Sequence, residues 1–396
     1  MKIPYGRHFI DRLDILSVSK ALRENFITQG PIIEKFEKKI CKIVKCKYAV
    51  ALSSCSAGLH LAVASIKKNK NKNKIITSPI SFVSTANAIL HNNYKPTFLD
   101  IDRQSLNLNV ENIEKYLKKE KKINAMITVH LGGLPAHSIK LHKLSKARKI
   151  FLIEDAAHSF GAKYEDGSLV GSCKYSDVTV FSSHPVKTIT TGEGGIVTTN
   201  SKKIYESLIK LRSHGVEKNF KRWKNKKLGF TNHKKNQWYY EAQEIGYNYR
   251  ITDFQCALGI SQLRKLKKII VKRKKIADFY DKNFRLLKNI YIPQFQQRND
   301  SSNHLYILNI NFNNLKINKN TFMSLLEKKK IITQVHYIPI PLHPLYKNLG
   351  YNIKNLIETK KYYETAISIP IFYSLTMKLQ KKIIFCVRQI INKYSR

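Results

Sequence analysis

The sequence predicts an α/β fold with a large domain, built as a sheet between two layers of helices, and a smaller C-terminal α+β domain. Short apolar runs alternate with segments of helical spacing through the first half of the chain, which is typical of a largely parallel sheet. With 396 residues, 43% of them hydrophobic, the chain can bury one large core and a smaller one. We expect the large domain over residues 1–265 and the small domain over 266–396.

The large domain is expected to begin with helical segments over 10–28 and 32–44, and the alternating part follows. Apolar runs predict strands over 48–53, 74–78, 96–100, 124–130, 150–154, 177–182 and 195–199. The intervening segments predict helices over 56–67, 81–92, 110–118, 138–148 and 201–212.

A long helix over 252–284 is expected to lead into the small domain. There the sequence predicts strands over 305–312 and 332–337, helices over 319–329 and 376–393, and a proline-rich stretch over 338–344. Residues 217–244 form a lysine-rich and aromatic insertion, to which the sequence assigns no role.

The formal net charge of +44 raises the question of nucleic acid binding, since a basic patch is the usual footprint of phosphate recognition. The lysines are spread along the chain, however, and no helix-turn-helix, zinc-finger or RNA-binding motif accompanies them. We therefore expect no nucleic acid partner, and a polyanion-binding regulatory protein is the rival class. The main lysine runs lie over 67–74, 118–122, 221–227 and 265–275.

Cysteine usage and the short apolar runs indicate a cytoplasmic protein without a metal site or a membrane segment. The six cysteines occur in no CxxC spacing, and a chain of this length needs no disulfides. Its apolar runs are far shorter than the roughly 18 residues of a membrane span. The first residues contain no apolar signal core.

The stretch over 182–195 sets Lys187 between a hydroxyl-bearing strand end at Ser182 and a glycine-rich turn. An ordinary lysine is a hydrated cation with a pKa of about 10.4, and it attacks an aldehyde only where its surroundings suppress that charge. Glycines let a cofactor approach the backbone closely. The pattern predicts a Schiff-base lysine, although the stretch alone also fits a solvated lysine between two strands.

Two further side chains follow the apolar strand that begins at Phe151. Asp155 ends the strand and His158 comes three residues later, where ligands of α/β sheets bind. A buried pyridinium nitrogen needs a carboxylate partner, which Asp155 can supply. Taken separately, Asp155 could be a turn or cap residue and His158 a satisfied core residue.

The segment over 48–64 reads as a short strand that feeds the N-terminus of a helix through small and hydroxyl residues. The unpaired N–H groups of such a first turn, from Cys55 to Ala57, together with the helix dipole form a phosphate site. Ser182 could add a hydroxyl to the same phosphate. The alternative is plain N-capping by Ser53, Ser54 or Ser56.

In this order the motifs resemble those of the DegT/DnrJ/EryC1/StrS family of sugar aminotransferases, which are pyridoxal-phosphate enzymes of fold type I. The resemblance covers nearly the whole chain and implies that fold, a pyridoxal 5'-phosphate cofactor and L-glutamate as amino donor. The matching segments are Thr28–Gly30, Ser53–Ala57, Ser78–Val83, Glu154–His158, His184–Lys187, Thr191–Gly195, Arg212–Gly215 and Gly246–Gln255.

The resemblance also implies roles for individual residues. Lys187 would carry the cofactor and move protons, Asp155 would pair with the pyridine nitrogen, and Phe82 would stack on the ring. His158 lies where many relatives have glutamine, near the phenolic oxygen of the ring. The phosphate would be held partly from a second subunit, which implies a homodimer with shared active sites. The expected phosphate ligands are Cys55, where alanine is usual, Ser56, Ala57, Ser182 and the partner subunit's Asn248.

Within the family, the segments over 301–306, 334–339 and 369–370 are most similar to the transaminases of pseudaminic acid synthesis. This implies a UDP-linked 4-keto-6-deoxy-N-acetyl hexose that receives the amino group at C4. Another UDP- or dTDP-linked keto sugar is the main alternative, and a dehydratase is disfavoured because such members carry histidine where this chain has Lys187. The expected sugar contacts are Tyr5, Asn25, Phe26, Ile27, Thr28, His336, Tyr337, Ile338 and Pro339, although His336 could equally be a satisfied residue of an inner strand.

Overall fold

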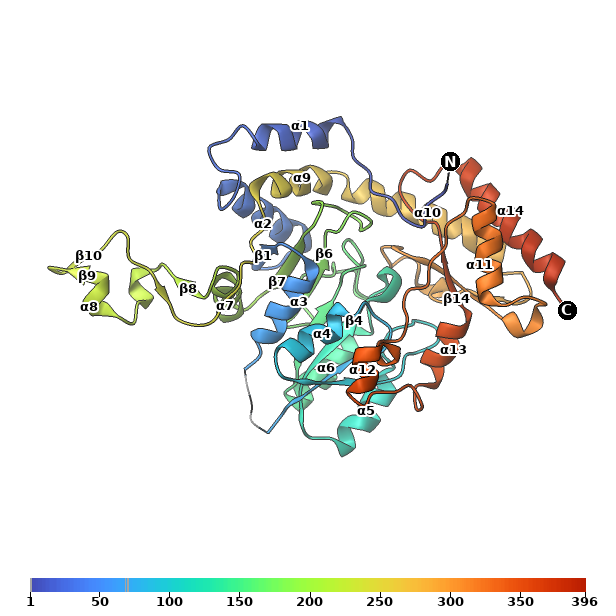
Figure 1. Ribbon diagram of the computed structural model, residues 1–396, viewed down its shortest axis with the longest axis horizontal. Coiled ribbons are helices and arrows are strands. Elements are labelled where there is room, and N and C mark those ends of the chain that lie inside the picture. The colour runs from blue at the N-terminus through green and yellow to red at the C-terminus, as the bar shows by residue number, and fades with distance from the viewer. Residues whose placement is uncertain (1, 68, 70) are drawn as a thin grey trace.

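A sheet of seven strands in the order β1-β7-β6-β5-β4-β2-β3 forms the centre of the large part of the molecule (Figure 1). The computed structural model describes residues 2–67, 69 and 71–396, so Lys68 and Lys70 of the first lysine run lie outside the described part. Strand β7 is antiparallel to both neighbours, and the other pairings are parallel, which confirms the largely parallel sheet. The strands are β1 Tyr48–Leu52, β2 Lys74–Thr77, β3 Lys95–Phe98, β4 Ile123–Val129, β5 Phe151–Asp155, β6 Val178–Ser182 and β7 Gly195–Thr199.

Helices cover both faces of this sheet, as the alternation of elements predicts. Side chains alternate along a strand, so Val50 and Leu52 of β1 pack under α3 and α7, while Ala49 and Ala51 pack under α2 and α9. The helices that surround the sheet are α1 Arg12–Ala21, α2 Pro31–Val44, α3 Cys55–Ala64, α4 Ser84–His91, α5 Val110–Lys119, α6 Ser138–Arg148, α7 Lys202–Arg212 and α9 Asp253–Leu263. Helix α1 stops well short of Thr28, so the expected helix over 10–28 is wrong beyond Ala21.

The expected single helix over 252–284 is also wrong, because the chain forms α9 and then α10 Leu266–Phe284. At the joint, the N–H of Lys265 donates to the Gln262 carbonyl at 2.9 Å, a tighter turn than an α-helix makes. The Lys265 ammonium pairs with Asp14 and Asp11 of the first helical segment. Contacts with residues distant in sequence therefore set the break, which the local helical spacing does not reveal.

A second, antiparallel sheet of strands β12 Ile290–Tyr291, β13 Tyr306–Ile310 and β14 Ala366–Ile369 lies in the C-terminal third. The strand expected over 305–312 is present as β13, but 332–337 forms no strand. Gln334 makes only an isolated bridge with Ser368, through N–H···O distances of 3.1 and 2.7 Å. The helices here are α11 Lys319–Lys328, α12 Pro344–Asn348, α13 Ile357–Thr365 and α14 Met377–Tyr394. The division at 265 and 266 stays a prediction.

The first residues of the chain pack against this C-terminal sheet (Figure 1). Ile3 is buried in the cluster formed by α10, α11, α14, β13 and β14. Its N–H donates to the Lys330 carbonyl at 2.8 Å, and its carbonyl accepts from the Ile332 N–H at 2.9 Å. The carbonyl of Tyr5 accepts from the Ile371 N–H. The chain therefore closes on itself through its first few residues.

The insertion over 217–244 forms an arm that projects from the body of the molecule beyond α7 (Figure 1). It contains β8 Val216–Glu217, α8 Lys226–Gly229, β9 Phe230–Thr231, β10 Lys234–Lys235 and β11 Glu241–Ala242. The remaining short helices of the chain are 3-10 turns at Leu131–Gly133, Phe220–Arg222, Phe295–Gln297, Phe312–Asn314 and Ile340–Leu342. Among the described residues, none of the helices has the length and apolar character needed to cross a bilayer.

Candidate active site

A pocket of about 420 Å³ opens where β5 and β6 end and α3 begins, and the C-terminal part closes its far wall. Its lining includes ten of the predicted site residues: Tyr5, Cys55, Ser56, Phe82, Asp155, His158, Ser182, Lys187, His336 and Tyr337. The remaining lining residues are Ser54, Ser81, Ser84, Val129, His130, Ala157, His184, Val186 and Glu193. The fold therefore gathers side chains that are far apart in the sequence at one edge of the sheet, as expected for ligand sites of α/β proteins.

Lys187 follows β6 in a turn that its backbone N–H closes on the His184 carbonyl at 2.9 Å. Burial lowers the pKa of its ammonium to about 8, while the carboxyl of Asp155 acts in the opposite direction. A lysine with this pKa has a substantial fraction of free amine near neutral pH. That property separates Lys187 from an exposed lysine and favours the Schiff-base prediction over the solvated alternative.

Asp155 ends β5 at the bottom of the pocket and is 5% exposed. Burial raises the pKa of its carboxyl, although hydrogen bonds to it act against the shift. The Thr85 hydroxyl donates to Oδ2 at 2.6 Å, and the Ala157 N–H donates to Oδ1 at 3.2 Å. These donors fix the carboxyl group in position and stabilise its charged form.

His158 lies on the same side of the pocket and is neutral, because burial holds the pKa of its imidazole well below the usual value. Its Nδ1 accepts from the Gly132 N–H at 3.3 Å, which assigns the proton to Nε2. Nε2 lies 3.0 Å from the Tyr337 hydroxyl, so the imidazole donates to it. His158 thus links β5 to the C-terminal wall of the pocket.

The C-terminal wall is formed by His336 and Tyr337. Burial lowers the pKa of His336 to about 4, so this imidazole is neutral near pH 7. Its Nδ1 lies 2.9 Å from the Ser368 hydroxyl, and its ring centre lies 5.2 Å from that of Tyr5. The ring centre of Phe82 lies 6.1 Å from the ring centre of Tyr337, and both residues line the pocket. His336 is therefore both hydrogen-bonded in the fold and present in the lining.

The N-terminus of α3 faces the pocket through Cys55 and Ser56. Ser54 is the N-cap, and its hydroxyl accepts from the Ala57 N–H at 3.1 Å, so the capping alternative is realised there. The amides of Cys55 and Ser56 have no acceptor within the helix. A Cβ on Gly195 would lie 2.2 Å from the Ser54 carbonyl oxygen, so this close approach of β7 requires glycine.

Several expected contacts lie outside this pocket in the single chain. The carbonyl of Ile27 accepts from the Asp253 N–H, and Thr28 bridges Thr252, which holds the segment from Asn25, including the exposed Phe26, beside α9. Asn248 bridges Ser213. Other members outside the lining are Ala57, Ile338 and Pro339. Their roles stay predictions.

Sequence reasoning missed a buried polar group behind Asp155. His130 lies in the lining, with Nδ1 3.0 Å from the Ser159 hydroxyl and Nε2 3.5 Å from Glu154 Oε1. Burial alone would raise the pKa of Glu154, but His130 and hydroxyl donors lower it. The position of His130 at the end of the strand expected over 124–130, at the same sheet edge as Asp155, was the available signal.

Arg273 of α10 was also missed, and it is fully buried beside Lys187. Its guanidinium donates to the carbonyls of His304 and Ile371, both at 3.1 Å. A buried cation here disfavours a second positive charge and so contributes to the lowered pKa of Lys187. No signal in the sequence marks Arg273, because it is one of several basic residues on this helix.

Comparisons with known proteins agree with this geometry. The model of the DegT/DnrJ/EryC1/StrS aminotransferase family matches residues 9–388. The UDP-4-amino-4,6-dideoxy-N-acetyl-beta-L-altrosamine transaminase of Campylobacter jejuni (serotype O:23/36) is 34% identical over 100% of this chain and 99% of its own length. Among solved structures, Helicobacter pylori PseC, an aminotransferase involved in the biosynthesis of pseudoaminic acid, superposes with a TM-score of 0.90 at 29% identity over the whole of both chains.

The sugar aminotransferase Spr1654 of Streptococcus pneumoniae, described as putative and solved in a PLP form, superposes with a TM-score of 0.85 at 25% identity, over 99% of each chain. The fold is that of these PLP-dependent sugar aminotransferases. Lys187, Asp155 and Ser182 line one pocket, and the family model spans nearly the whole sequence. The chain therefore belongs to the DegT/DnrJ/EryC1/StrS aminotransferase family.

Proposed function

We propose that the protein is a pyridoxal-phosphate-dependent aminotransferase that moves the amino group of L-glutamate to C4 of a UDP-linked 4-keto-6-deoxy-N-acetyl hexose. The observation that carries the proposal is Lys187, whose pKa is lowered to about 8 in a pocket that also contains Asp155 and Ser182. The relatives from Campylobacter jejuni and Helicobacter pylori support the sugar substrate through their names.

The residues of the pocket fit pyridoxal phosphate. A buried carboxyl, a deprotonatable amine and free amides at a helix N-terminus are the groups that a pyridine nitrogen, an aldehyde and a phosphate require. Asp155 would hold the ring nitrogen, Lys187 the aldehyde carbon, and the amides of Cys55 and Ser56 with the Ser182 hydroxyl the phosphate. When bound, the cofactor supplies an electron sink for the charge left by proton removal.

The residues of this chain then divide the proton transfers among them. Lys187 Nζ removes the Cα proton of glutamate in one half-reaction and delivers a proton to sugar C4 in the other. The Asp155 carboxylate, held by Thr85 and Ala157, keeps the proton on the ring nitrogen. Neutral His158 donates to Tyr337 and so keeps the sugar-side wall in place.

The sugar is proposed to lie against Tyr5, His336 and Tyr337, the expected contacts that line the pocket. The binding site for the cofactor phosphate is proposed to be completed by the partner subunit's Asn248 in a homodimer. The side chain of Asn248 is absent from the lining of the single chain, which is what a residue acting in the other subunit requires. Phe26 and Ile27 are exposed beside α9 and remain candidates for the same interface or for substrate contact.

Turnover with a panel of UDP- and dTDP-linked keto sugars, with L-glutamate as donor, tests the substrate. We expect the highest kcat/KM for the UDP-linked 4-keto-6-deoxy-N-acetyl hexose. Lys187→Arg should be inactive, and the matched variant Lys202→Arg, at an exposed position of α7, should keep activity. A higher kcat/KM with another keto sugar would reject the proposed substrate but leave the proposed aminotransferase activity standing. Activity in Lys187→Arg would reject the proposed mechanism.

A further inference from the structure

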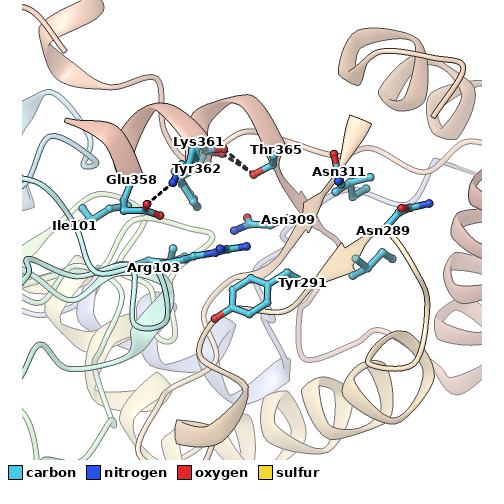
Figure 2. A pocket seen from close by; sticks show the side chains of 13 residues that line it. Ile101, Arg103, Asn289, Tyr291, Asn309, Asn311, Glu358, Lys361, Tyr362 and Thr365 are labelled. Carbon is cyan, nitrogen blue, oxygen red and sulfur yellow. Dashed lines mark hydrogen bonds and ion pairs between the residues drawn. The ribbon is translucent and has the colours of Figure 1, made fainter. Parts of the chain in front are cut away.

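A second cavity of about 360 Å³ lies between a loop of the N-terminal half and the C-terminal sheet, and it shares no lining residue with the active-site pocket. Its walls are the loop over 101–106, the paired strands β12 and β13, and helix α13 (Figure 2). The volume falls in the range of small-molecule sites. Tyr362 lines it, and the hydroxyl of this residue donates to the His336 carbonyl, so the cavity adjoins the backbone of the active-site wall.

One wall offers a cation that the fold leaves without a counter-ion. The Arg103 guanidinium lies 5.0 Å from the centre of the Tyr291 ring, which orients it along the cavity (Figure 2). Arg103 is exposed, and within the described part of the chain its side chain makes no hydrogen bond and no ion pair. A planar guanidinium with free donors is suited to a carboxylate or a phosphate.

The opposite wall carries an ion pair. The Lys361 ammonium lies 2.8 Å from Glu358 Oε1, and both side chains line the cavity (Figure 2). The charges of Arg103, Lys361 and Glu358 leave a net positive charge around the space. The site therefore favours an anion, while Glu358 can still accept from a neutral hydroxyl.

Between these walls lies an acceptor without a donor. Asn309 Oδ1 is buried, and no hydrogen-bond partner for it exists among the described residues. The side chain lies between Arg103 and Tyr362 in the close view (Figure 2). Because a buried acceptor without a donor is unfavourable, a rotation of this side chain that turns Oδ1 toward a ligand hydroxyl in the cavity would satisfy it.

We propose that this cavity binds a small hydroxylated anion of monosaccharide size, a sugar phosphate or a sugar acid. Its anionic group lies at Arg103 and Lys361, and its hydroxyls donate to Asn309 Oδ1 and Glu358. A bare anion would leave the amide unsatisfied, and a neutral sugar would leave Arg103 without a counter-ion. An amino acid is disfavoured because its ammonium would compete with Lys361 for Glu358.

Calorimetric titration of the full-length protein tests the proposal. The probes are N-acetylglucosamine 1-phosphate and glucuronate as the two sugar anions, with N-acetylglucosamine, inorganic phosphate and L-glutamate as comparisons. Arg103→Gln is the test variant, and Arg148→Gln, at an exposed position of α6, removes the same charge elsewhere. Any binding of these probes in the active-site pocket should be the same in all variants, so a difference in affinity between variants measures binding in the second cavity.

We expect at least one sugar anion to bind the wild type and Arg148→Gln equally and to bind Arg103→Gln about tenfold more weakly or worse, the loss of one charge-assisted hydrogen bond. Asn309→Leu should weaken the sugar anion without changing the response to inorganic phosphate. If only the sugar phosphate binds, or only the sugar acid, the result identifies which of these two classes the cavity takes. Equal binding to Arg103→Gln, no binding at all, or tighter binding of phosphate, glutamate or the neutral sugar at Arg103 would overturn the proposal.

Discussion

The lowered pKa of Lys187 predicts how covalent attachment of pyridoxal phosphate depends on pH. The free amine attacks the aldehyde, so the rate follows the deprotonated fraction and rises with pH until the ammonium has titrated. Because burial lowers the pKa from 10.5 to about 8, the rise should end near pH 8 instead of continuing into the alkaline range.

The size of the effect follows from the same two values. At pH 7 a pKa of about 8 leaves about a tenth of the amine deprotonated, whereas a pKa of 10.5 leaves about 0.03%. The difference is about 300-fold in reactive amine. An advantage of this size should direct low concentrations of the aldehyde to Lys187, in spite of the many exposed lysines of this chain.

Rapid mixing of the cofactor-free protein with pyridoxal phosphate, followed by borohydride reduction and peptide mapping, measures both rate and position. The measurement runs from about pH 6 to about pH 11, so that it spans both pKa values. Lys202→Arg should give the wild-type profile and Lys187→Arg should lose the fast phase. A fast phase with an apparent pKa near 10, or an adduct spread over several lysines at neutral pH, would refute the reasoning.

Three further predictions concern neighbouring groups. Asp155→Ala should still bind the cofactor but lose proton abstraction, so turnover should fall by several orders of magnitude; turnover near the wild type would reject its role. Inactive Lys187→Ala chains mixed with inactive Asn248→Ala chains should regain activity through heterodimers, and heterodimers without activity would argue against shared sites. His336→Ala and Tyr337→Phe should raise the KM of the sugar much more than that of glutamate, by steady-state kinetics, because a substrate contact affects one substrate only; equal changes would assign both residues to the fold.

Much of the sheet could be predicted from the sequence because each central strand is buried on both faces and so appears as a continuous apolar run. The same reasoning failed at the α9–α10 joint, where Asp14 and Lys265 meet although 251 positions separate them in the sequence. It failed again around Gln334, because a strand needs several consecutive residues paired with a neighbouring strand. Here only Gln334 pairs, with Ser368. Local pattern predicts an element, and distant contacts decide where it ends.

The same limit applies to the site. That Lys187, Asp155 and Ser182 lie in one pocket could be predicted, because each has an unusual local setting at a strand end; their roles stay predictions. Arg273 could not, since its role depends on burial beside Lys187 and nothing in its own helix distinguishes it from the surrounding basic residues. The segment around Phe26 was predicted to contact the sugar, but within a single chain it does not line the pocket.

The buried position of Ile3 has a consequence for how the protein is made. Ile3 pairs with Lys330 and Ile332, and Tyr5 pairs with Ile371, so each of these two residues is synthesised long before its partners. The segment around Ile3 therefore stays without its partners until the strands and helices of the C-terminal third have been made, and that core closes only then. Removing these first residues would weaken the part of the molecule farthest from them in sequence.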